Sequence, residues 1–122
     1  MSKEKISIIV PCYNEEEALP IFYKEINRVS KEMKSVDFEF LFINDGSKDK
    51  TLNVLKEFAK KDKRVRFISF SRNFGKEAGM YAGLENATGD YVAIMDADMQ
   101  DPPEMVKVMY HLIKEEDHDC VA

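Results

Sequence analysis

The sequence predicts an α/β protein in which helices cover both faces of a mostly parallel sheet. Short apolar runs rich in β-branched residues alternate along the chain with stretches whose apolar residues recur at helical spacing. This alternation is typical of parallel strands joined by helical crossovers. The chain has 122 residues, of which 44% are hydrophobic, so it can form one domain with its own core. We therefore expect a single three-layer α/β/α unit.

The first strand is expected over Ile6–Val10, which is β-branched at most positions and is followed by Pro11. The proline is expected to end the strand. Asn14 offers an N-cap for the next helix, with Glu17 as its capping-box partner. Apolar residues at helical spacing carry that helix to about Lys34.

The second strand is expected over Phe38–Ile43, because the turn-forming sequence Asn44–Ser47 follows it. The helix after this turn has one apolar face, formed by Leu52, Leu55, Phe58 and Ala59. Val65–Phe70 is then the third strand.

The next helix is expected from Lys76 to about Asn86, and Gly89 separates it from a fourth strand over Tyr91–Met95. Pro102 and Pro103 suit the first turn of a last helix. The buried side of that helix is expected to be Met105, Val106, Met109, Leu112 and Ile113.

The last residues, Asp119–Ala122, resemble the beginning of a fifth strand. We therefore expect the sheet to be truncated there, with an exposed edge that allows self-association. Right-handed crossovers place the four complete strands in the order 3-2-1-4. In such a sheet, ligands bind at the carboxyl ends of the strands where the order reverses.

Polar residues gather at these strand ends. They are Tyr13, Asn14 and Glu15 after the first strand, Asp45 after the second, and Asp96, Asp98 and Gln100 after the fourth. Each cluster has a plain structural interpretation as a helix cap or a turn. Together, they indicate a binding site.

Asp96-Ala97-Asp98 is an Asp-x-Asp motif directly after an apolar strand. Its two carboxylates and the amide oxygen of Gln100 are hard ligands that suit Mg²⁺ or Mn²⁺, and such an ion completes its shell with phosphate oxygens. The sequence contains neither the P-loop pattern nor Gly-x-Gly-x-x-Gly after the first strand. We therefore expect a metal-dependent nucleotide site, unlike those of P-loop kinases and NAD enzymes.

The composition argues against several other classes. The net charge of −5 and the pI of about 5.1 disfavour nucleic-acid binding. Apolar runs fall short of the about 20 residues that cross a membrane. Cys12 and Cys120 are too few for a disulfide framework and lack metal-ligand spacing. These features favour a cytoplasmic protein.

Three motifs, in this order, resemble those of the family 2 inverting glycosyltransferases with the GT-A fold: Ile8–Glu16, Asn44–Ser47 and Asp96–Glu104. Arg72–Lys76 strengthens the resemblance. The last motif is most similar to the branch that makes polyprenyl-phosphate sugars. The resemblance implies that residues 1–122 are the Rossmann-like, nucleotide-sugar-binding donor part of a GT-A domain whose acceptor part is absent.

The resemblance also implies the residues of a donor site. They are Pro11, Tyr13, Asn14, Glu15, Ile43, Asp45, Lys76, Asp96, Ala97 and Asp98. By this resemblance, the residues after the first strand line the base and ribose, and Ile43 and Asp45 close on the base. Asp98 and Gln100 are the implied metal ligands, beside Asp96. Arg72 and Lys76 suit the donor pyrophosphate or an acceptor phosphate.

The activity that the resemblance implies is metal-dependent transfer of a sugar, with inversion, from a UDP- or GDP-sugar to a polyprenyl phosphate in glycan biosynthesis. The catalytic base is expected beyond residue 122, so the isolated chain is expected to be inactive. The whole protein is expected in the cytoplasm or at the cytoplasmic face of a membrane.

Other readings stay open. One is a transferase for a polysaccharide or another acceptor, and another is a non-catalytic nucleotide-sugar-binding module. A receiver-like or phosphatase domain is less well matched, because Pro11–Asn14 stands where its acidic first-strand end belongs.

Overall fold

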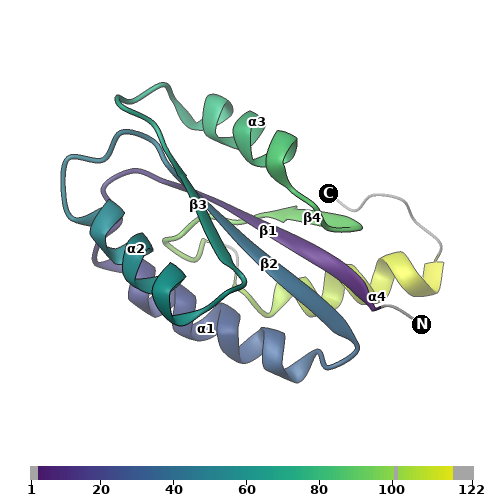
Figure 1. The fold of residues 1–122 in the computed structure, drawn as a ribbon. Helices are drawn as coiled ribbons and strands as arrows, with labels where there is room; N and C mark the ends of the chain where they lie inside the picture. Colours follow the sequence, from purple (N-terminus) through teal and green to yellow (C-terminus); the bar gives the residue numbers. More distant parts are fainter. Residues whose placement is uncertain (1–2, 101, 117–122) are drawn as a thin grey trace.

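The computed structural model describes residues 3–100 and 102–116, which form one parallel sheet covered by helices (Figure 1). The strands are β1 (Glu4–Cys12), β2 (Val36–Asn44), β3 (Val65–Ser69) and β4 (Tyr91–Ile94). All three strand pairs are parallel, and the order is β3-β2-β1-β4. The predicted α/β class and strand order are therefore confirmed. The expected fifth strand, Asp119–Ala122, lies outside the described residues.

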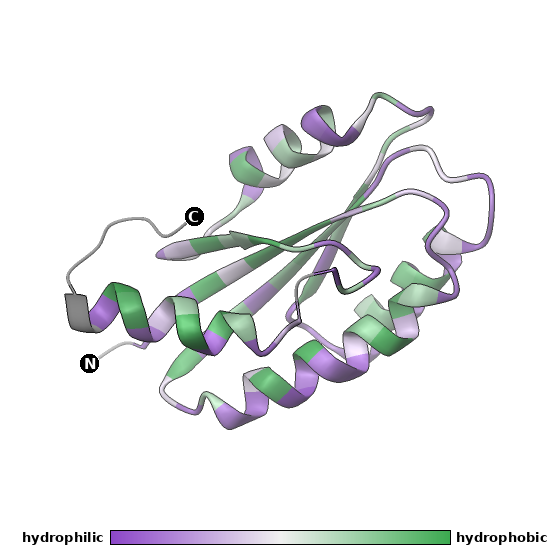
Figure 2. Ribbon diagram, turned by 180° about the vertical axis from the view of Figure 1, so that it is seen from behind, coloured by the Kyte–Doolittle hydropathy of each residue, from purple (hydrophilic) through white to green (hydrophobic). Residues whose placement is uncertain are grey.

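The helices divide unequally between the two faces of the sheet. They are α1 (Ala18–Glu32), α2 (Thr51–Lys61), α3 (Lys76–Asn86) and α4 (Met105–Glu116). In Figure 1, α1, α2 and α4 lie on one face, and α3 lies alone on the other. Figure 2 shows hydrophobic and hydrophilic residues alternating along α1 and α4, as expected for helices with one buried side.

The larger core lies between the sheet and α1, α2 and α4. Every second residue of β1 and β2 points into it, including Ile8 and Phe40, and both are fully buried. The Phe22 ring of α1 meets the Phe42 ring of β2 edge to face, at 6.3 Å between centroids. From α4, Val106 is buried, whereas Met105 is 42% exposed, so the prediction that Met105 faces the core was wrong.

The smaller core lies under α3, on Ile9, Leu41 and Ile43. The helix approaches closely because its contact residues are glycines. A Cβ on Gly83 would lie 2.4 Å from Cγ2 of Ile9, whereas one on Gly79 would lie 3.5 Å from Cγ2 of Ile43. No large side chain of α3 is therefore needed to cover the sheet at this point.

Two carboxylates of β2 and its following loop hold the chain on either side of α3. Asp45 accepts hydrogen bonds from the amides of Phe74 and Gly75, just before the helix. Glu39 accepts one from the amide of Thr88, just after it. Both carboxylates are nearly inaccessible, at 4% and 3% exposure. They fix both ends of a helix that has little apolar contact of its own.

Pro11 does not end the first strand, contrary to the prediction. β1 continues to Cys12, and Pro11 pairs in register with Ile43. Pairing with β4 stops earlier, at Ile9, whose carbonyl accepts the amide of Met95. In a strand, the backbone N–H and C=O groups of alternate residues point to the same neighbouring strand. Pro11, two residues after Ile9, therefore points toward the β4 side, where β4 no longer pairs with β1. Its missing N–H therefore costs the sheet no hydrogen bond.

The predicted capping box at Asn14 is also wrong. α1 begins at Ala18, and its N-cap residue, Glu17, makes no side-chain capping bond. Asn14 has a φ of 53°, and its side-chain oxygen accepts a hydrogen bond from the amide of Lys48 at 2.8 Å. Its own amide donates to the Ser47 hydroxyl. Asn14 thus joins two loops, which lie far apart in sequence, at the carboxyl edge of the sheet.

Candidate functional site

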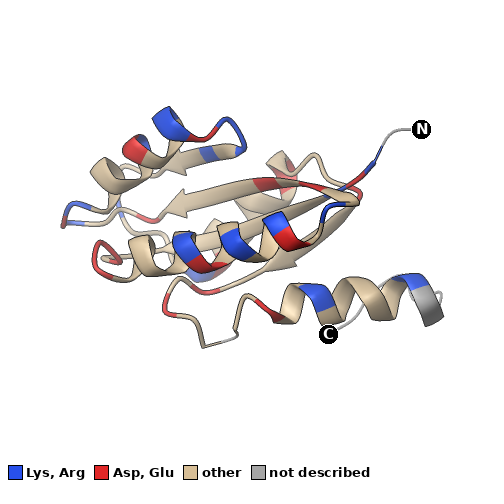
Figure 3. Cartoon of the chain, turned by 90° about the horizontal axis from the view of Figure 1, so that it is seen from below, with Lys and Arg blue, Asp and Glu red and all other residues tan. Residues whose placement is uncertain are grey.

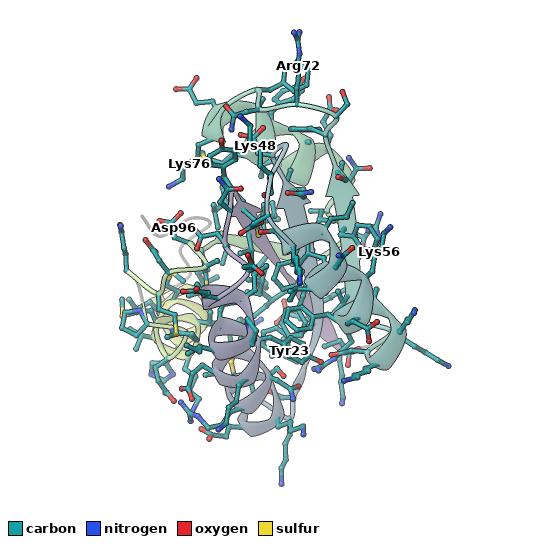
Figure 4. The ribbon with its side chains drawn as sticks, turned by 90° about the vertical axis from the view of Figure 1, so that its left-hand side faces the viewer. Tyr23, Lys48, Lys56, Arg72, Lys76 and Asp96 are labelled. Carbon is teal, nitrogen blue, oxygen red and sulfur yellow. The ribbon has the colours of Figure 1, made fainter. Side chains whose placement is uncertain are left out.

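A cleft of about 440 Å³ opens at the carboxyl edge of the sheet, beside the point where β1 and β4 part. Its lining residues come from four segments and are Pro11, Cys12, Tyr13, Glu15, Asp45, Asn73, Gly75, Lys76 and Asp96. Figure 4 looks onto this edge, with Lys76 and Asp96 labelled. The cleft lies at the position that the strand order predicts.

The β1 end of the cleft combines apolar and acidic groups. Pro11 is half-buried and Tyr13 is 43% exposed, so a flat apolar surface is available there. The amide of Glu15 donates to the hydroxyl of buried Thr51. Burial raises the pKa of the Glu15 carboxyl, and the negative charges of Asp98, Asp49 and Asp96 raise it further. The site is therefore rich in negative charge, which a cation would relieve.

Asp45 forms the floor of the cleft, and its carboxylate accepts hydrogen bonds from the loop that follows β3. Its carboxylate accepts hydrogen bonds from the amides of Phe74 at 2.7 Å and Gly75 at 2.9 Å, and from Nδ2 of Asn73 at 3.1 Å. A Cβ on the next residue, Gly46, would lie 2.2 Å from the carbonyl carbon of Arg72. The loops after β2 and β3 are thus in backbone contact, and a side chain at position 46 would separate them.

In the exposed part of the loop after β3, a cationic side chain stacks on an aromatic ring. The Arg72 guanidinium lies 4.7 Å from the centroid of the Phe74 ring. That ring, 51% exposed, also meets Phe70 edge to face at 5.5 Å. Arg72 does not line the cleft.

Lys76 and Asp96 form an ion pair in the cleft. The Lys76 ammonium, in the first turn of α3, lies 2.8 Å from the carboxylate of Asp96, which follows β4. Both side chains remain accessible, at 58% and 27% exposure. The N-terminus of a helix also favours anions, through its free amides and its dipole. This end of the cleft can therefore receive a phosphate group.

The rest of the Asp-x-Asp segment lies beside the cleft. Asp98 is exposed, and its carboxylate accepts hydrogen bonds from the backbone amide and Nε2 of Gln100, the latter at 3.1 Å. Met99, between them, has a φ of 59°. Ala97 and Ile43 are buried, at 2% and 0% exposure, and neither lines the cleft.

The oxygen groups of this segment fit a divalent cation only in part. Among residues 3–100 and 102–116, no group of three or more His, Cys, Asp or Glu side chains is placed to hold a metal ion. Asp98, Gln100 and Asp96 do offer hard oxygen ligands. Mg²⁺ in particular is commonly held by one or two carboxylates, with the remaining positions filled by water and substrate phosphates. These residues therefore fit such an ion only where water or a bound ligand supplies its remaining positions.

Three residues that line the cleft, Cys12, Asn73 and Gly75, were not predicted from the sequence. Cys12 is 1% exposed, and burial raises the pKa of its thiol far above the usual range, so the thiol stays protonated in the wall of the cleft. Asn73 and Gly75 lie inside the motif Arg72–Lys76, for which only the charged residues Arg72 and Lys76 were predicted to bind a ligand. The φ of 103° at Gly75 marks it as a turn residue that only the structure reveals.

These features define an α/β protein with a parallel sheet, a cleft at the carboxyl edge of that sheet and an acidic segment beside the cleft. The profile of Glycosyl transferase family 2 matches residues 7–122. The chain belongs to this family.

A prophage bactoprenol glucosyl transferase homolog of Escherichia coli (strain K12) is 51% identical to the chain over 110 residues. The match covers 90% of this chain and 35% of the relative. The chain thus spans about one third of the length of the curated relatives that it matches.

Two solved structures illustrate the same fold. S. aureus TarS 1-349 in complex with UDP is 25% identical, with a TM-score of 0.70, over 94% of this chain and 33% of that one. The mannosyltransferase PcManGT from Pyrobaculum calidifontis, solved with GDP-Man and Mn²⁺, is 19% identical, with a TM-score of 0.77, over 94% of this chain and 34% of that one. The expected fold, that of the N-terminal part of a GT-A glycosyltransferase, is therefore confirmed.

A membrane-spanning helix is not found in the described part of the chain, where every helix is too short or too polar to cross a bilayer.

Proposed function

We propose that this chain binds the nucleotide-diphosphate sugar, a UDP- or GDP-sugar, that serves as the donor of an inverting glycosyltransferase. The observation that carries the proposal is the cleft itself. It has an apolar surface at one end, at Pro11 and Tyr13, and an anion-binding end at Lys76 and the start of α3. A nucleoside diphosphate has the same polarity, with a flat base at one end and two phosphates at the other.

The base and ribose are proposed to lie against Pro11, Tyr13 and Glu15, above Asp45. The buried Asp45 carboxylate already accepts three hydrogen bonds from the neighbouring loop. A carboxylate offers about four acceptor positions, so one remains for a ring N–H of the base. Ile43, which is fully buried in β2 two residues before Asp45, is proposed to support this floor. Asn14 is proposed to shape the loop through its bond to the Lys48 amide.

The pyrophosphate is proposed to lie between Lys76 and the Asp96–Gln100 segment. Lys76 is paired with Asp96, so the phosphates take over a cation that the protein already holds in place. Asp98 and Gln100, with Asp96 beside them, would hold Mg²⁺ or Mn²⁺, and the small Ala97 keeps the segment close to the sheet. Such an ion supplies neutralisation of the negative charge on a leaving nucleoside diphosphate.

A polyprenyl phosphate is the proposed acceptor. The support is the 51% identity to a bactoprenol glucosyl transferase homolog, far higher than the identity to the solved structures. Because a lipid phosphate is already anionic near neutral pH, its oxygen needs little help from a base to attack the sugar. With such an acceptor, the whole protein is proposed to act at the cytoplasmic face of a membrane.

Calorimetric titration of the chain with UDP and with GDP, each with and without Mn²⁺, tests the donor site. One nucleotide is expected to bind, with an affinity that rises when Mn²⁺ is present. Asp98→Ala is expected to remove the effect of the metal. The matched control is Asp37→Ala, which removes an exposed carboxylate at the opposite end of the sheet. Binding of neither nucleotide, or equal effects of both substitutions, would contradict the proposal.

A further inference from the structure

Six exposed lysines lie along α2 and its flanking loops. They are Lys48, Lys50, Lys56, Lys60, Lys61 and Lys63, and we call them the α2 lysine face. Residues 48–66 contain eight Lys and Arg against three Asp and Glu, a balance of +5 in a chain whose net charge is −5. Figure 3 shows blue segments at the end of α2 and in the loop that follows it. Positive charge is thus concentrated along one edge of an acidic molecule.

Neighbouring acids neutralise little of this charge. Asp62 is bound by Arg64 at 2.7 Å, and Asp49 is hydrogen-bonded to the start of α2. Glu57 is the remaining acid of the stretch and lies 3.6 Å from Lys60. With the residues that the structure describes, the other five lysines form no ion pair within 4.0 Å. Their charge is therefore available to a partner.

The arrangement suits an extended anionic surface better than a single anion. Convergent donors bind a discrete phosphate, whereas these ammonium groups sit on flexible stems along the convex side of a helix. Lys50 is the N-cap residue of α2 and Lys61 is its last residue, so this part of the face extends over about 16 Å. A nucleic acid is a poorer match, because the chain as a whole is acidic.

We propose that the α2 lysine face rests on a membrane surface that contains anionic lipids. The inference rests on the proposed function, because a polyprenyl-phosphate acceptor is held in a membrane. The face begins at Lys48, three residues after Asp45 on the floor of the cleft. Figure 4 shows Lys48 at the carboxyl edge of the sheet and Lys56 on α2. Docking by this face brings the donor cleft close to the lipid surface.

Flotation of the chain with lipid vesicles tests the proposal. The chain is expected to float with vesicles of about one third phosphatidylglycerol and to stay behind with pure phosphatidylcholine. Raising the salt from about 50 to about 500 mM is expected to release it, because salt shortens the Debye length. Lys56→Gln/Lys60→Gln/Lys61→Gln is expected to reduce the bound fraction at least about fivefold at low salt. Glutamine preserves helix propensity, so the fold is retained.

The matched control is Lys24→Gln/Lys31→Gln/Lys34→Gln, which removes the same charge from exposed positions on and after α1. It is expected to float nearly as well as the unchanged chain. Equal loss in the two variants, no preference for anionic lipid, or tighter binding to a short DNA duplex than to the vesicles would overturn the proposal. Nucleotide titration of both variants separates this test from that of the donor site, since neither variant alters the cleft.

Discussion

The Lys76 ammonium and the Asp96 carboxylate lie 2.8 Å apart and connect the first turn of α3 to the end of β4 across the cleft. The pair combines a group that attracts phosphate with one that repels it. A ligand that binds here must therefore exchange one anionic partner of Lys76 for another.

Lys76→Ala is expected to weaken binding of the nucleoside diphosphate about tenfold or more, since a hydrogen bond to a charged group contributes about 1.5–3 kcal/mol. The corresponding nucleoside is expected to lose little affinity, because it has no phosphate. Titration calorimetry of both ligands checks this difference. Lys56→Ala, an exposed lysine of α2, serves as the control. Equal losses for nucleotide and nucleoside would show that Lys76 does not act through phosphate.

Asp45→Ala is expected to lower the free energy of unfolding by about 2–4 kcal/mol, because it leaves the donors of Asn73, Phe74 and Gly75 without their acceptor. Urea denaturation measures the loss. Asp37→Ala, at an exposed aspartate of the same strand region, is expected to change stability by less than about 0.5 kcal/mol. Similar losses from both substitutions would exclude a special role for Asp45.

We expect Glu39 to contribute to the free energy of unfolding in a way that depends on pH in the acidic range. Burial alone would raise the pKa of its carboxyl, but hydrogen bonds from Ser7, Thr88 and Arg66 outweigh burial and lower the pKa to about 2. The folded pKa is below the ordinary value of 4.5. This contribution is therefore present above pH 4.5 and is lost as the pH falls toward 2.

In Glu39→Gln, the free energy of unfolding is expected to fall less steeply between pH 4.5 and pH 2 than in the unchanged chain. Urea denaturation at a series of pH values gives both slopes. Glu57→Gln, on the exposed side of α2, is the control and is expected to keep the original slope. An unchanged slope in Glu39→Gln would contradict the assignment.

Substitution by alanine is expected to have opposite effects on stability at the two glycines of α3, Gly79 and Gly83. Gly83→Ala is expected to cost about 1–3 kcal/mol, because its Cβ would lie 2.4 Å from Ile9 and the core must shift. Gly79→Ala meets Ile43 at 3.5 Å, an ordinary contact, and gains up to about 1 kcal/mol of helix propensity. Thermal unfolding of the two variants is expected to shift in opposite directions. A loss of stability in Gly79→Ala would show that α3 lies closer to the sheet than described.

Periodicity and topology rules were sufficient for the architecture. The α3 boundaries, Lys76–Asn86, were predicted as they occur, and the other elements differ mainly at their ends. The errors at Pro11 and Asn14 have a common cause. Both residues were interpreted from local rules, whereas the departure of β4 and the loop around Lys48 decide their roles.

The site was predictable in its charges but not in its bonding. The aspartates at strand ends pointed to the cleft because topology brings strand ends together. That Asp45 is held by the amides of Phe74 and Gly75 could not be predicted, since it depends on how two loops meet in space. The same holds for Asp98, which the structure places beside the cleft rather than in its wall.

The attachment of α3 has a consequence for local opening. The helix contributes two glycines to the smaller core, and the chain beside it is held by Asp45 before its start and by Glu39 after its end. Helix α1, by contrast, buries Leu19, Phe22, Ile26 and Val29 in the larger core. Because α3 can detach without exposing the larger core, its backbone amides are expected to exchange with solvent through a partial opening. The amides of α1 are expected to exchange only when the whole domain unfolds.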